Sequence, residues 1–509
     1  MSFLFGGLQP IWSRVALDGV TVTLLGYCIS TEADYVNTIV LLISILLTWF
    51  TAGLTNRWTL SFPMVPLLLL QESRRYPIVH RSSLASILVA VLSTLLLILS
   101  ITLCMAFPPL QPPPIRGPYK VGIVDLHLPV TGGDFIVARI LYPTEDHHSG
   151  AMPYLKPNLA SGFLKGSVKN MAPPPINSCY WILDYWKFIH IDSKQHAPPM
   201  QGKKFPLIAF SHGLGGSASA YSHVTRSMAA NGHVVIAVDH TDGSHPMVVK
   251  RDGTVVHYDA TPITELWSKG KVLEYTRIRR KQTEFRAAEL IAAAEALRSL
   301  NVRNIPELQQ LGISFVDCLD VDRLHIMGHS FGGSTALTVA FRRPDIVHSV
   351  VAHEPMADWT PNDVRMQLFP QAAMELYGEN HTGGTGGRGE IERPLLTTYD
   401  HMPSLFLFSG EFDRKNWGSI KFFQFMFQNG LLGRDGHHAI LDEIHHNEFS
   451  DMCFLTPIWL TRALKMTGRR NPIDNVAEVV HRSLAFLESQ SSVPDVKRTG
   501  VDLEKKEEL

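Results

Sequence analysis

The sequence predicts a doubly wound α/β domain with a mostly parallel sheet, preceded by an N-terminal α-helical transmembrane region. From residue 117 onward, short apolar runs alternate with longer amphipathic segments, an order typical of parallel strands joined by helices. A serine flanked by glycines stands between one such run and a segment of small residues. Before residue 108, two long stretches carry no charged side chain. We therefore expect a membrane region over residues 1–107, a linker over 108–116, a folded domain over 117–488 and a polar tail over 489–509.

The expected strands are of two kinds. Residues 119–128 and 135–142 alternate between apolar and polar side chains and are separated by a Gly-Gly turn, which predicts two strands. Buried parallel strands are predicted by the shorter apolar runs at 205–211, 233–238, 324–327, 349–352 and 404–408. Helices are expected at 221–231 and at 285–300, the second being rich in alanine with Glu and Arg on its polar face.

Ser330 is the candidate nucleophile because its surroundings fit a strained strand-to-helix turn. It is the centre of the pentapeptide 328–332, Gly-His-Ser-Phe-Gly, which follows a predicted strand and precedes a predicted helix. Strand, Gly-x-Ser-x-Gly, helix is the nucleophile elbow of the α/β-hydrolase fold, in which the serine oxygen is exposed. The backbone N–H of Phe331 is then expected to stabilise an oxyanion. A glycine-rich structural turn is the alternative, and His329 is expected to be a packing residue.

A second oxyanion donor is expected in the loop that follows the run 205–211. The sequence at 211–216 is Ser-His-Gly-Leu-Gly-Gly, and its glycines let the backbone turn sharply. The N–H of Leu214 can then point at the negative charge that develops during acyl transfer. The same glycines could instead form only a tight turn.

His446 is the predicted general base. In α/β-hydrolases the chain order is serine, acid, histidine, and the histidines after the last predicted strand are His437, His438, His445 and His446. His446 begins a loop-to-helix segment at the C-terminal edge of the domain, and its neighbour His445 could substitute for it. The spacing of these histidines matches no zinc pattern, so neither a metal nor a cofactor is expected.

The acid of the triad has two candidates. Glu354 follows the predicted strand at 349–352, and Asp413 follows the one at 404–408. Both positions are strand C-termini, where α/β sheets place catalytic groups. Either carboxylate could orient His446 and hold its ring in the right tautomer.

Two apolar stretches predict helices that cross a membrane. Residues 35–56 and 84–107 have no charged side chain, and each is longer than the roughly 20 residues that a spanning helix needs. The shorter runs at 58–70 and 20–29 are ambiguous, so a third crossing remains open. Neither long stretch has the position of a cleaved signal peptide. The proline run that follows predicts a stiff, extended spacer between membrane and domain.

Charge placement indicates an orientation in the membrane. The loop between the two stretches carries four arginines and one acid: Arg57, Arg74, Arg75, Arg81 and Glu72. Because cationic loops stay cytoplasmic, both chain ends are expected on the lumenal or exterior side. The C-terminal Lys-Glu-Glu-Leu resembles a lumenal retrieval signal, and Asn380 begins a glycosylation sequon. We therefore expect a multi-pass endoplasmic-reticulum protein with a lumenal folded domain.

Composition excludes some classes of partner. Lysine plus arginine nearly balances aspartate plus glutamate, 46 against 47, so no nucleic-acid partner is expected. The five cysteines are scattered without a Cys-x-x-Cys pair, which indicates buried thiols rather than a disulfide framework. The aromatic segment 179–191 could be a membrane-facing lid or a packed helix. Nothing in the sequence fixes an oligomeric state.

The folded domain resembles the platelet-activating-factor acetylhydrolase family, which includes lipoprotein-associated phospholipase. The residues that carry the resemblance occur in order at 117–122, 139–143, 210–215, 238–244, 328–333 and 446–451. The resemblance implies a calcium-independent serine esterase that removes short or oxidised sn-2 acyl groups from phospholipids. It departs from the family at Glu354, where an aspartate is usual, and in the membrane region and the glycine-rich insertion at 383–387. The first departure keeps Asp413 open as the acid, although Glu354 is narrowly preferred.

Overall fold

The structure, a computed structural model, describes two units of which one carries the fold. The described residues are 91, 95, 98, 110–132, 134–146, 150–156, 159–171, 186, 189–368, 402–414, 423 and 436–491. One unit comprises residues 1–110 and 182–189, and the other comprises 111–181 and 190–509. Apart from three helical positions, the predicted spans at 35–56 and 84–107 lie outside the described residues. Among the residues that are described, no helix has both the length and the apolar character to cross a bilayer.

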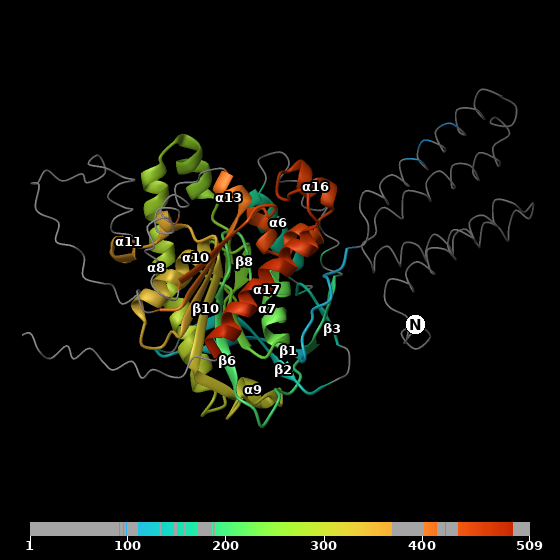
Figure 1. Ribbon diagram of the computed structural model, residues 1–509, viewed down its shortest axis with the longest axis vertical. Coiled ribbons are helices and arrows are strands. Elements are labelled where there is room, and N and C mark those ends of the chain that lie inside the picture. The colour runs from blue at the N-terminus through green and yellow to red at the C-terminus, as the bar shows by residue number, and fades with distance from the viewer. Residues whose placement is uncertain are drawn as a thin grey trace, which may run out of the picture. The chain divides into compact units, whose positions relative to one another are not determined.

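A nine-stranded, mostly parallel sheet forms the centre of the second unit (Figure 1). Its spatial order is β13-β12-β11-β10-β6-β7-β2-β1-β5. The first six strands run parallel, β2 is antiparallel to both of its neighbours, and β5 is parallel to β1. The strands are β1 (Lys120–Pro129), β2 (Phe135–Thr144), β5 (Lys194–Gln195), β6 (Phe205–Ser211), β7 (Val234–Val238), β10 (Leu319–His329), β11 (Ser349–His353), β12 (Ser404–Ser409) and β13 (Gly436–Leu441). The predicted sheet is confirmed.

The strands that sequence reasoning missed lie at edges or in small two-stranded sheets. Two additional two-stranded sheets pair β3 (Ala151–Pro153) with β4 (His190–Asp192), and β8 (Met247–Val249) with β9 (Val255–His257). No strand was predicted at β13, and His437 and His438, which were expected beyond the last strand, belong to this edge strand. Most of its side chains are exposed or half-buried, so the strand lacks the apolar run by which the central strands were recognised.

Helices cover both faces of the sheet (Figure 1). On one face α7 (Ser222–Ala230) packs against α17 (Pro472–Ser491), and on the other α8 (Val272–Ser299) packs against α10 (Phe331–Arg342). The prediction placed the start of α8 too late, at residue 285. Its first turns expose apolar side chains such as Leu273, which is 59% exposed, and so they lack the buried stripe that marks an amphipathic helix.

The remaining helices and helical turns are short. The α-helices are α6 (Ala160–Met171), α9 (Pro306–Gln310), α11 (Asn362–Leu368), α13 (Gly410–Arg414), α15 (Met452–Leu455) and α16 (Ile458–Ala463). The other turns are η3 (Ser219–Tyr221), η4 (Pro262–Leu266), η5 (Trp267–Lys269), η6 (Ala357–Trp359) and η8 (His446–Phe449). Of these short elements, α13 follows β12 and η8 follows β13, and both carry residues of the predicted site.

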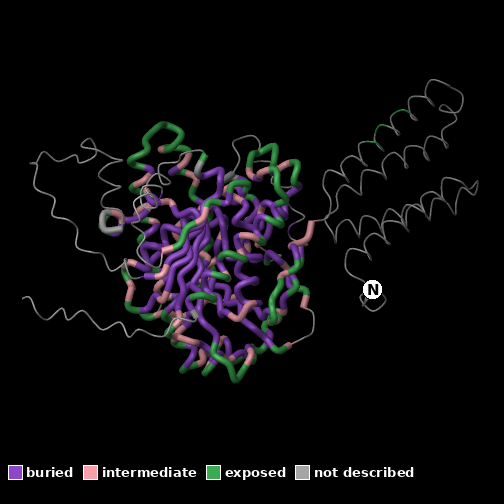
Figure 2. The backbone as a smooth tube through the Cα atoms, viewed as in Figure 1, coloured by how far each residue is buried: buried purple, intermediate pink, exposed green. Residues whose placement is uncertain are grey.

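The carboxyl ends of the central strands carry polar residues, and the parallel register brings these ends together. Every side chain of β6, β7 and β11 is buried, and Figure 2 shows the buried residues concentrated along the sheet. In the parallel register Gly328 pairs with Ser211, and His329 pairs with His353. The chain therefore leaves β6, β10 and β11 side by side at one edge of the sheet, where ligands of α/β folds bind.

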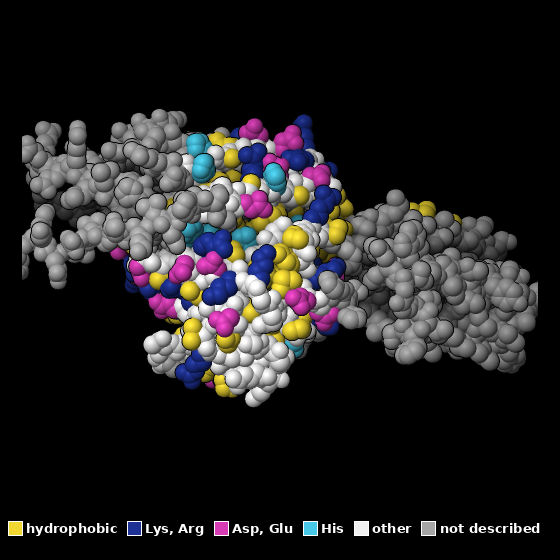
Figure 3. All heavy atoms as spheres, turned by 60° about the horizontal axis from the view of Figure 1, so that its bottom comes forward, with side chains coloured by type: hydrophobic (Ala, Val, Ile, Leu, Met, Phe, Trp, Pro, Cys, Tyr) yellow, Lys and Arg dark blue, Asp and Glu magenta, His cyan; other side chains and the backbone are white. Residues whose placement is uncertain are grey.

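The described surface carries charges of both signs. In the view of Figure 3, lysines and arginines are interspersed with acidic side chains rather than gathered into one basic patch. This arrangement agrees with the nearly balanced composition of 46 basic and 47 acidic residues.

Candidate active site

Ser330 occupies a strained turn between β10 and α10. Its φ is 55° and its ψ is −115°, a left-handed conformation that a residue with a side chain rarely adopts. The turn is held because the Ser330 N–H donates to the His353 carbonyl at 2.8 Å. A Cβ at Gly332 would overlap the Ser211 carbonyl, so only glycine lets helix and strand approach this closely. The geometry is that of the predicted elbow.

His446 lies directly opposite the serine. Its Nε2 is 3.0 Å from the Ser330 Oγ, within hydrogen-bonding distance. The ring is carried at the start of η8, and the His446 backbone N–H donates to Glu411 Oε2 at 2.9 Å. Both groups retain access to the surface, since Ser330 is 6% exposed and the His446 side chain 17%. The structure thus brings together two residues that are 116 positions apart.

The carboxylate of Glu354 contacts the His446 imidazole on the side opposite Ser330. Its Oε2 is in short hydrogen-bonding contact with His446 Nδ1, while its Oε1 accepts the N–H of Ser409. The side chain is fully buried. The backbone turns immediately after β11 with a φ of 44° at Glu354, which aims the carboxylate across the strand ends. The N–H of the same residue donates to the Leu407 carbonyl at 2.8 Å and fixes that turn.

The alternative residues stand elsewhere. Asp413 belongs to α13, and its side chain lies outside the described residues. The Nδ1 of His445 is 3.7 Å from Glu411 Oε2 and 3.4 Å from the Lys465 carbonyl. His437 and His438 are in the edge strand β13. Of the described candidates, Glu354 and His446 are the pair that forms a chain of contacts to Ser330.

Two buried carboxylates that sequence reasoning missed anchor the segment that carries His446. Glu448 accepts the N–H of His445 at 2.7 Å and the side-chain amide of Asn475 at 2.9 Å, which ties η8 to α17. Asp451 accepts the N–H of His223, in the first turn of α7, at 3.0 Å. Burial raises the pKa of Asp451 to about 8. The only sequence signal was their position after His446, which does not distinguish a solvated acid from a buried one.

The predicted oxyanion donors belong to α10 and to the turn after β6, two segments that approach each other at Gly332 and Ser211. Phe331 is the first residue of α10, and helix formation leaves its N–H without an intrahelical acceptor. Leu214 lies in the turn after β6, where Gly213 donates its N–H to the Tyr221 hydroxyl at 3.1 Å. That hydroxyl in turn donates to His329 Nδ1 at 2.8 Å. Tyr221 therefore links the turn to the elbow, a contact that no sequence pattern indicated.

His329 packs beneath the site. Its ring stacks on Phe449 with a centroid distance of 5.1 Å and lies 4.7 Å from the ring of His446. Burial lowers its pKa well below the ordinary value of a histidine, so the ring is neutral at physiological pH. These contacts confirm the expected packing position.

A second Ser-His-Glu chain lies in the interior. The Oγ of Ser211 is 2.9 Å from His240 Nε2, and His240 Nδ1 is 2.7 Å from Glu289 Oε2. Ser211 and His240 are fully buried. Burial, with the nearby Arg286 guanidinium, lowers the pKa of His240 well below its usual range, and burial raises that of Glu289 to about 7. Sequence reasoning missed this group because Glu289 was read as part of the polar face of a helix.

In the part of the chain that the structure describes, two clusters have ligand atoms close enough to hold a metal. They are His212, Asp239 and His245, and the site group His329, Glu354 and His446. In the first, His245 Nδ1 accepts the Met247 N–H at 3.0 Å, so the ring proton is on Nε2, which faces Asp239 at 3.1 Å and cannot bind a cation. In the second, both oxygens of Glu354 are already engaged. Neither donor set suits a metal in these protonation states.

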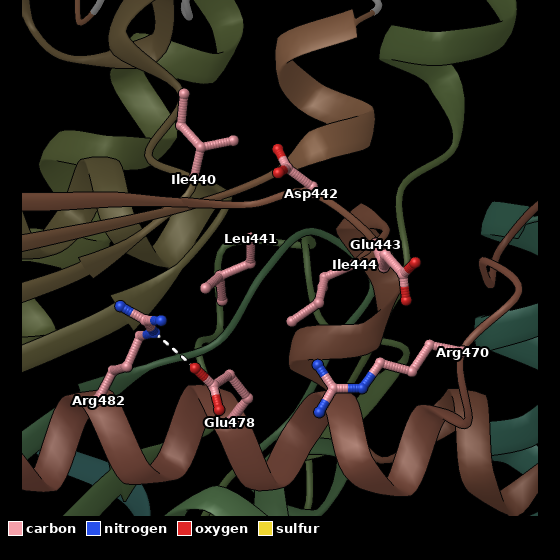
Figure 4. A pocket seen from close by; sticks show the side chains of 8 residues that line it. All are labelled: Ile440, Leu441, Asp442, Glu443, Ile444, Arg470, Glu478 and Arg482. Atoms are coloured by element: carbon pink, nitrogen blue, oxygen red, sulfur yellow. Dashed lines mark hydrogen bonds and ion pairs between the residues drawn. The ribbon is translucent and has the colours of Figure 1, made fainter.

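A pocket of about 230 Å³ lies close to the site but does not contain it (Figure 4). It is lined by Ile440, Leu441, Asp442, Glu443, Ile444, Arg470, Glu478 and Arg482, between the end of β13 and α17. Two of these residues lie one turn apart on α17, where Arg482 donates to Glu478 at 2.7 Å. Ser330 and His446 are not among its lining residues.

Comparison with known proteins points to one family. The family model described as platelet-activating factor acetylhydrolase, isoform II, matches residues 105–356 and 396–508. A model of the prolyl oligopeptidase family matches residues 311–443. A platelet-activating factor acetylhydrolase of Cavia porcellus is 31% identical over 389 residues, covering 73% of this chain and 76% of that protein.

Other relatives are matched over shorter lengths. The Canis lupus familiaris protein of the same name is 29% identical over 44% of this chain, and the chain spans about half, 50%, of that relative's length. The Gallus gallus protein is 31% identical over 59% of this chain and 65% of its own length. Among solved structures, a ferulic acid esterase from Streptomyces cinnamoneus is 17% identical with a TM-score of 0.45, covering 74% of this chain and 91% of that one.

Proposed function

Because the chain belongs to the platelet-activating factor acetylhydrolase isoform II family, we propose that it is a serine esterase that removes short or oxidised sn-2 acyl groups from phospholipids. The observation that carries the proposal is the chain of contacts from Ser330 through His446 to Glu354. In this proposal Ser330 is the nucleophile, His446 the general base and Glu354 the orienting acid. The N–H groups of Leu214 and Phe331 form the oxyanion hole.

The reaction proceeds by two acyl transfers. His446 takes the proton of Ser330 as the serine oxygen attacks the ester carbonyl, and the two backbone N–H groups stabilise the resulting oxyanion. Collapse of the tetrahedral intermediate expels the lysophospholipid oxygen, which takes the proton from His446. Water, deprotonated by the same imidazole, then attacks the acyl-serine and releases the fatty acid. Glu354 stabilises the imidazolium that forms in each half and keeps Nε2 facing the serine.

No step of this mechanism requires a metal. The nucleophile is activated by an imidazole and the oxyanion is stabilised by backbone groups, so hydrolysis is expected to be independent of calcium. We expect the rate to be unchanged when the chelator EGTA is added in excess. A loss of activity that added calcium restores would contradict this part of the proposal.

The membrane region bears on where the substrate is met. We propose that residues 35–56 and 84–107 cross the endoplasmic-reticulum bilayer and hold the catalytic domain on the lumenal side, next to a phospholipid surface. The arginines between the two stretches and the sequon at Asn380 support this placement. Glycosylation of Asn380 in microsomes, removed by endoglycosidase and absent from Asn380→Gln, would test it; an unmodified Asn380 would count against a lumenal domain.

The proposal is tested by comparing substrates and one variant. The full-length protein in detergent or vesicles is given a phospholipid with an sn-2 acetyl group, one with a long sn-2 chain, and p-nitrophenyl acetate. We expect faster hydrolysis of the acetyl phospholipid than of the long-chain one, and a loss of about 10⁴-fold or more in Ser330→Ala.

Each other outcome has a definite meaning. Hydrolysis of p-nitrophenyl acetate without activity on either phospholipid would favour a carboxylesterase for small esters. An inert wild-type protein would favour a scaffold that keeps the fold without the activity. Full activity of Ser330→Ala would overturn the assignment of the nucleophile.

A further inference from the structure

Arg286 is a fully buried arginine on α8 that contacts residues on both sides of the proposed oxyanion hole. Its Nη2 donates to the His212 carbonyl at 2.6 Å, at the beginning of the turn that carries Leu214. Its guanidinium also lies 4.3 Å from the centre of the Phe331 ring, a cation–π distance. One side chain therefore contacts the residue two positions before one proposed donor and the side chain of the other.

The protonation state of His212 strengthens the first contact. Its Nε2 accepts the His240 N–H at 3.3 Å, so the ring proton is on Nδ1, which donates to the Gly213 carbonyl at 2.8 Å. Burial and the Arg286 charge lower the pKa of His212 well below its usual range, which keeps the ring neutral. The 3.0 Å approach of Arg286 Nη2 to that Nδ1 is then a contact of two donors, and the hydrogen bond of the arginine goes to the His212 carbonyl.

The arginine is itself held in place. Asp242 Oδ2 lies 3.9 Å from its Nε and balances its charge inside the protein. Asp242 is fixed in turn, because its Oδ1 accepts the N–H of Ser244 at 3.1 Å. Burial lowers the pKa of Arg286 to about 10, and the guanidinium is therefore still charged at neutral pH. A charged, planar group thus contacts both the His212 carbonyl and the Phe331 ring.

We infer that Arg286 is the positioning residue of the oxyanion hole, holding the turn of Leu214 and the first residue of α10 at a fixed separation. This inference rests on the proposed function, since it assumes that an oxyanion forms between those two backbone groups. An oxyanion hole accelerates the reaction only if its donors are in place before charge develops. Arg286 acts on the transition state through His212 and Phe331 and is not expected to touch the substrate.

Arg286→Lys tests the inference, with Arg279→Lys as a matched control. Lysine keeps the charge but lacks the planar fork that can stack on Phe331 and reach the His212 carbonyl together. Arg279 is also fully buried on α8 and lies 4.9 Å from the Tyr275 ring, but its guanidinium donates to Gln282 and not to a residue of the hole. Both substitutions therefore remove a buried guanidinium over an aromatic ring.

The measurements separate positioning from general damage to the fold. We expect Arg286→Lys to lower kcat about 30-fold or more with little change in KM, somewhat below the loss of about 10²–10³ for a deleted donor. Its affinity for phenylboronic acid, whose tetrahedral serine adduct mimics the charged intermediate, should fall in proportion. Its affinity for a non-hydrolysable sn-2 amide phospholipid should stay constant. Arg279→Lys should keep kcat within about threefold of wild type, since it touches neither donor.

A second variant keeps the test decisive if Arg286→Lys does not fold. Phe331→Leu removes the ring but keeps the backbone N–H, and we expect kcat to fall about threefold to tenfold with KM unchanged. Wild-type kcat in both Arg286→Lys and Phe331→Leu would overturn the inference. It would also be overturned if Arg286→Lys and Arg279→Lys lost kcat equally, in parallel with a drop in melting temperature. An inactive wild type, or an active Ser330→Ala, would instead overturn the proposed function, so the two failures are distinct.

Discussion

The described part of the protein contains two Ser-His-Glu chains of nearly the same geometry, one with a partly exposed histidine and one in the interior. In the first, Ser330 Oγ is 3.0 Å from His446 Nε2, and in the second, Ser211 Oγ is 2.9 Å from His240 Nε2. Each histidine presents its Nδ1 to a glutamate. Distances among the three side chains therefore do not distinguish a nucleophile from a structural serine.

The backbone and the surroundings make the difference. Ser330 stands on a turn with a φ of 55° and precedes a helix, whereas Ser211 ends a buried strand. The His446 side chain is 17% exposed, but Ser211 and His240 are fully enclosed. A buried imidazole resists protonation because burial disfavours the charged form, and the pKa of His240 is lowered accordingly. The interior chain can neither receive a substrate nor accept a proton readily.

The two chains are mechanically connected. Gly328, just before the elbow, pairs with Ser211 across the parallel sheet, and Gly332 packs against the Ser211 carbonyl. The residue Ser211 of the buried chain therefore packs directly against the turn that carries Ser330. Its glutamate comes from α8, the same helix that carries Arg286. This arrangement assigns chemistry to the exposed chain and support to the buried one.

The largest expected contrast is between the two serines. A fluorophosphonate probe should label the wild-type protein and Ser211→Ala, and should not label Ser330→Ala. Ester hydrolysis should fall about 10⁴-fold or more in Ser330→Ala. In Ser211→Ala it should stay within about tenfold, while the free energy of unfolding drops by about 1–3 kcal/mol because the His240 ring loses a buried partner.

Intact-mass spectrometry of the labelled proteins and urea unfolding check this pair. If the wild-type protein bound two equivalents of probe and Ser211→Ala bound one, the interior chain would be reactive. Ser211 would then not be a structural serine. An unlabelled Ser211→Ala protein with a normal unfolding curve would show that Ser211 is needed for the chemistry.

The glutamates give the next contrast. Glu354→Gln keeps an acceptor for the Ser409 N–H but turns an amide toward His446 Nδ1, which disfavours the tautomer that accepts the serine proton. We expect kcat to fall about 10³–10⁴-fold without a change in fold. Glu289→Gln, the same substitution in the buried chain, should lower kcat by no more than about tenfold, the effect of one altered hydrogen bond.

The kcat of both variants is measured by steady-state kinetics with p-nitrophenyl acetate, and Asp413→Asn serves as a control. Asp413 was the other acid that the sequence allowed, and we expect its substitution to leave kcat nearly unchanged. A loss in Asp413→Asn as large as that in Glu354→Gln would contradict the choice of acid.

The sequence predicted the exposed chain and not the buried one, for a physical reason. An elbow needs glycines at fixed positions around its serine, so Ser330 and the strand before it could be read directly. Glu354 and Asp413 remained alternatives because both follow strands, and only the register and the turn at Glu354 bring its carboxylate to His446. Glu289 and Arg286 lie on a helix whose charged residues were read as solvated. Their burial depends on packing against β6 and β7, which no local pattern records.

The last prediction concerns stability rather than catalysis, at a histidine that stays neutral beside the active chain. His353 is buried at the end of β11, its Nε2 lies 2.9 Å from the Ser483 hydroxyl, and burial lowers its pKa to about 3. Between pH 3 and 6.5 the unfolded chain therefore binds a proton that the folded protein does not. Stability should rise with pH across this range, by about 1.4 kcal/mol per pH unit from this group.

His353→Gln keeps an N–H donor for Ser483 but does not titrate. Urea unfolding at pH 4, 5 and 6 should show a slope reduced by about 1.4 kcal/mol per pH unit in this variant relative to wild type. Ser483→Ala, which removes the partner and leaves the imidazole, should lower stability by a similar amount at every pH. If His353→Gln keeps the wild-type slope, burial does not hold His353 neutral in the folded protein.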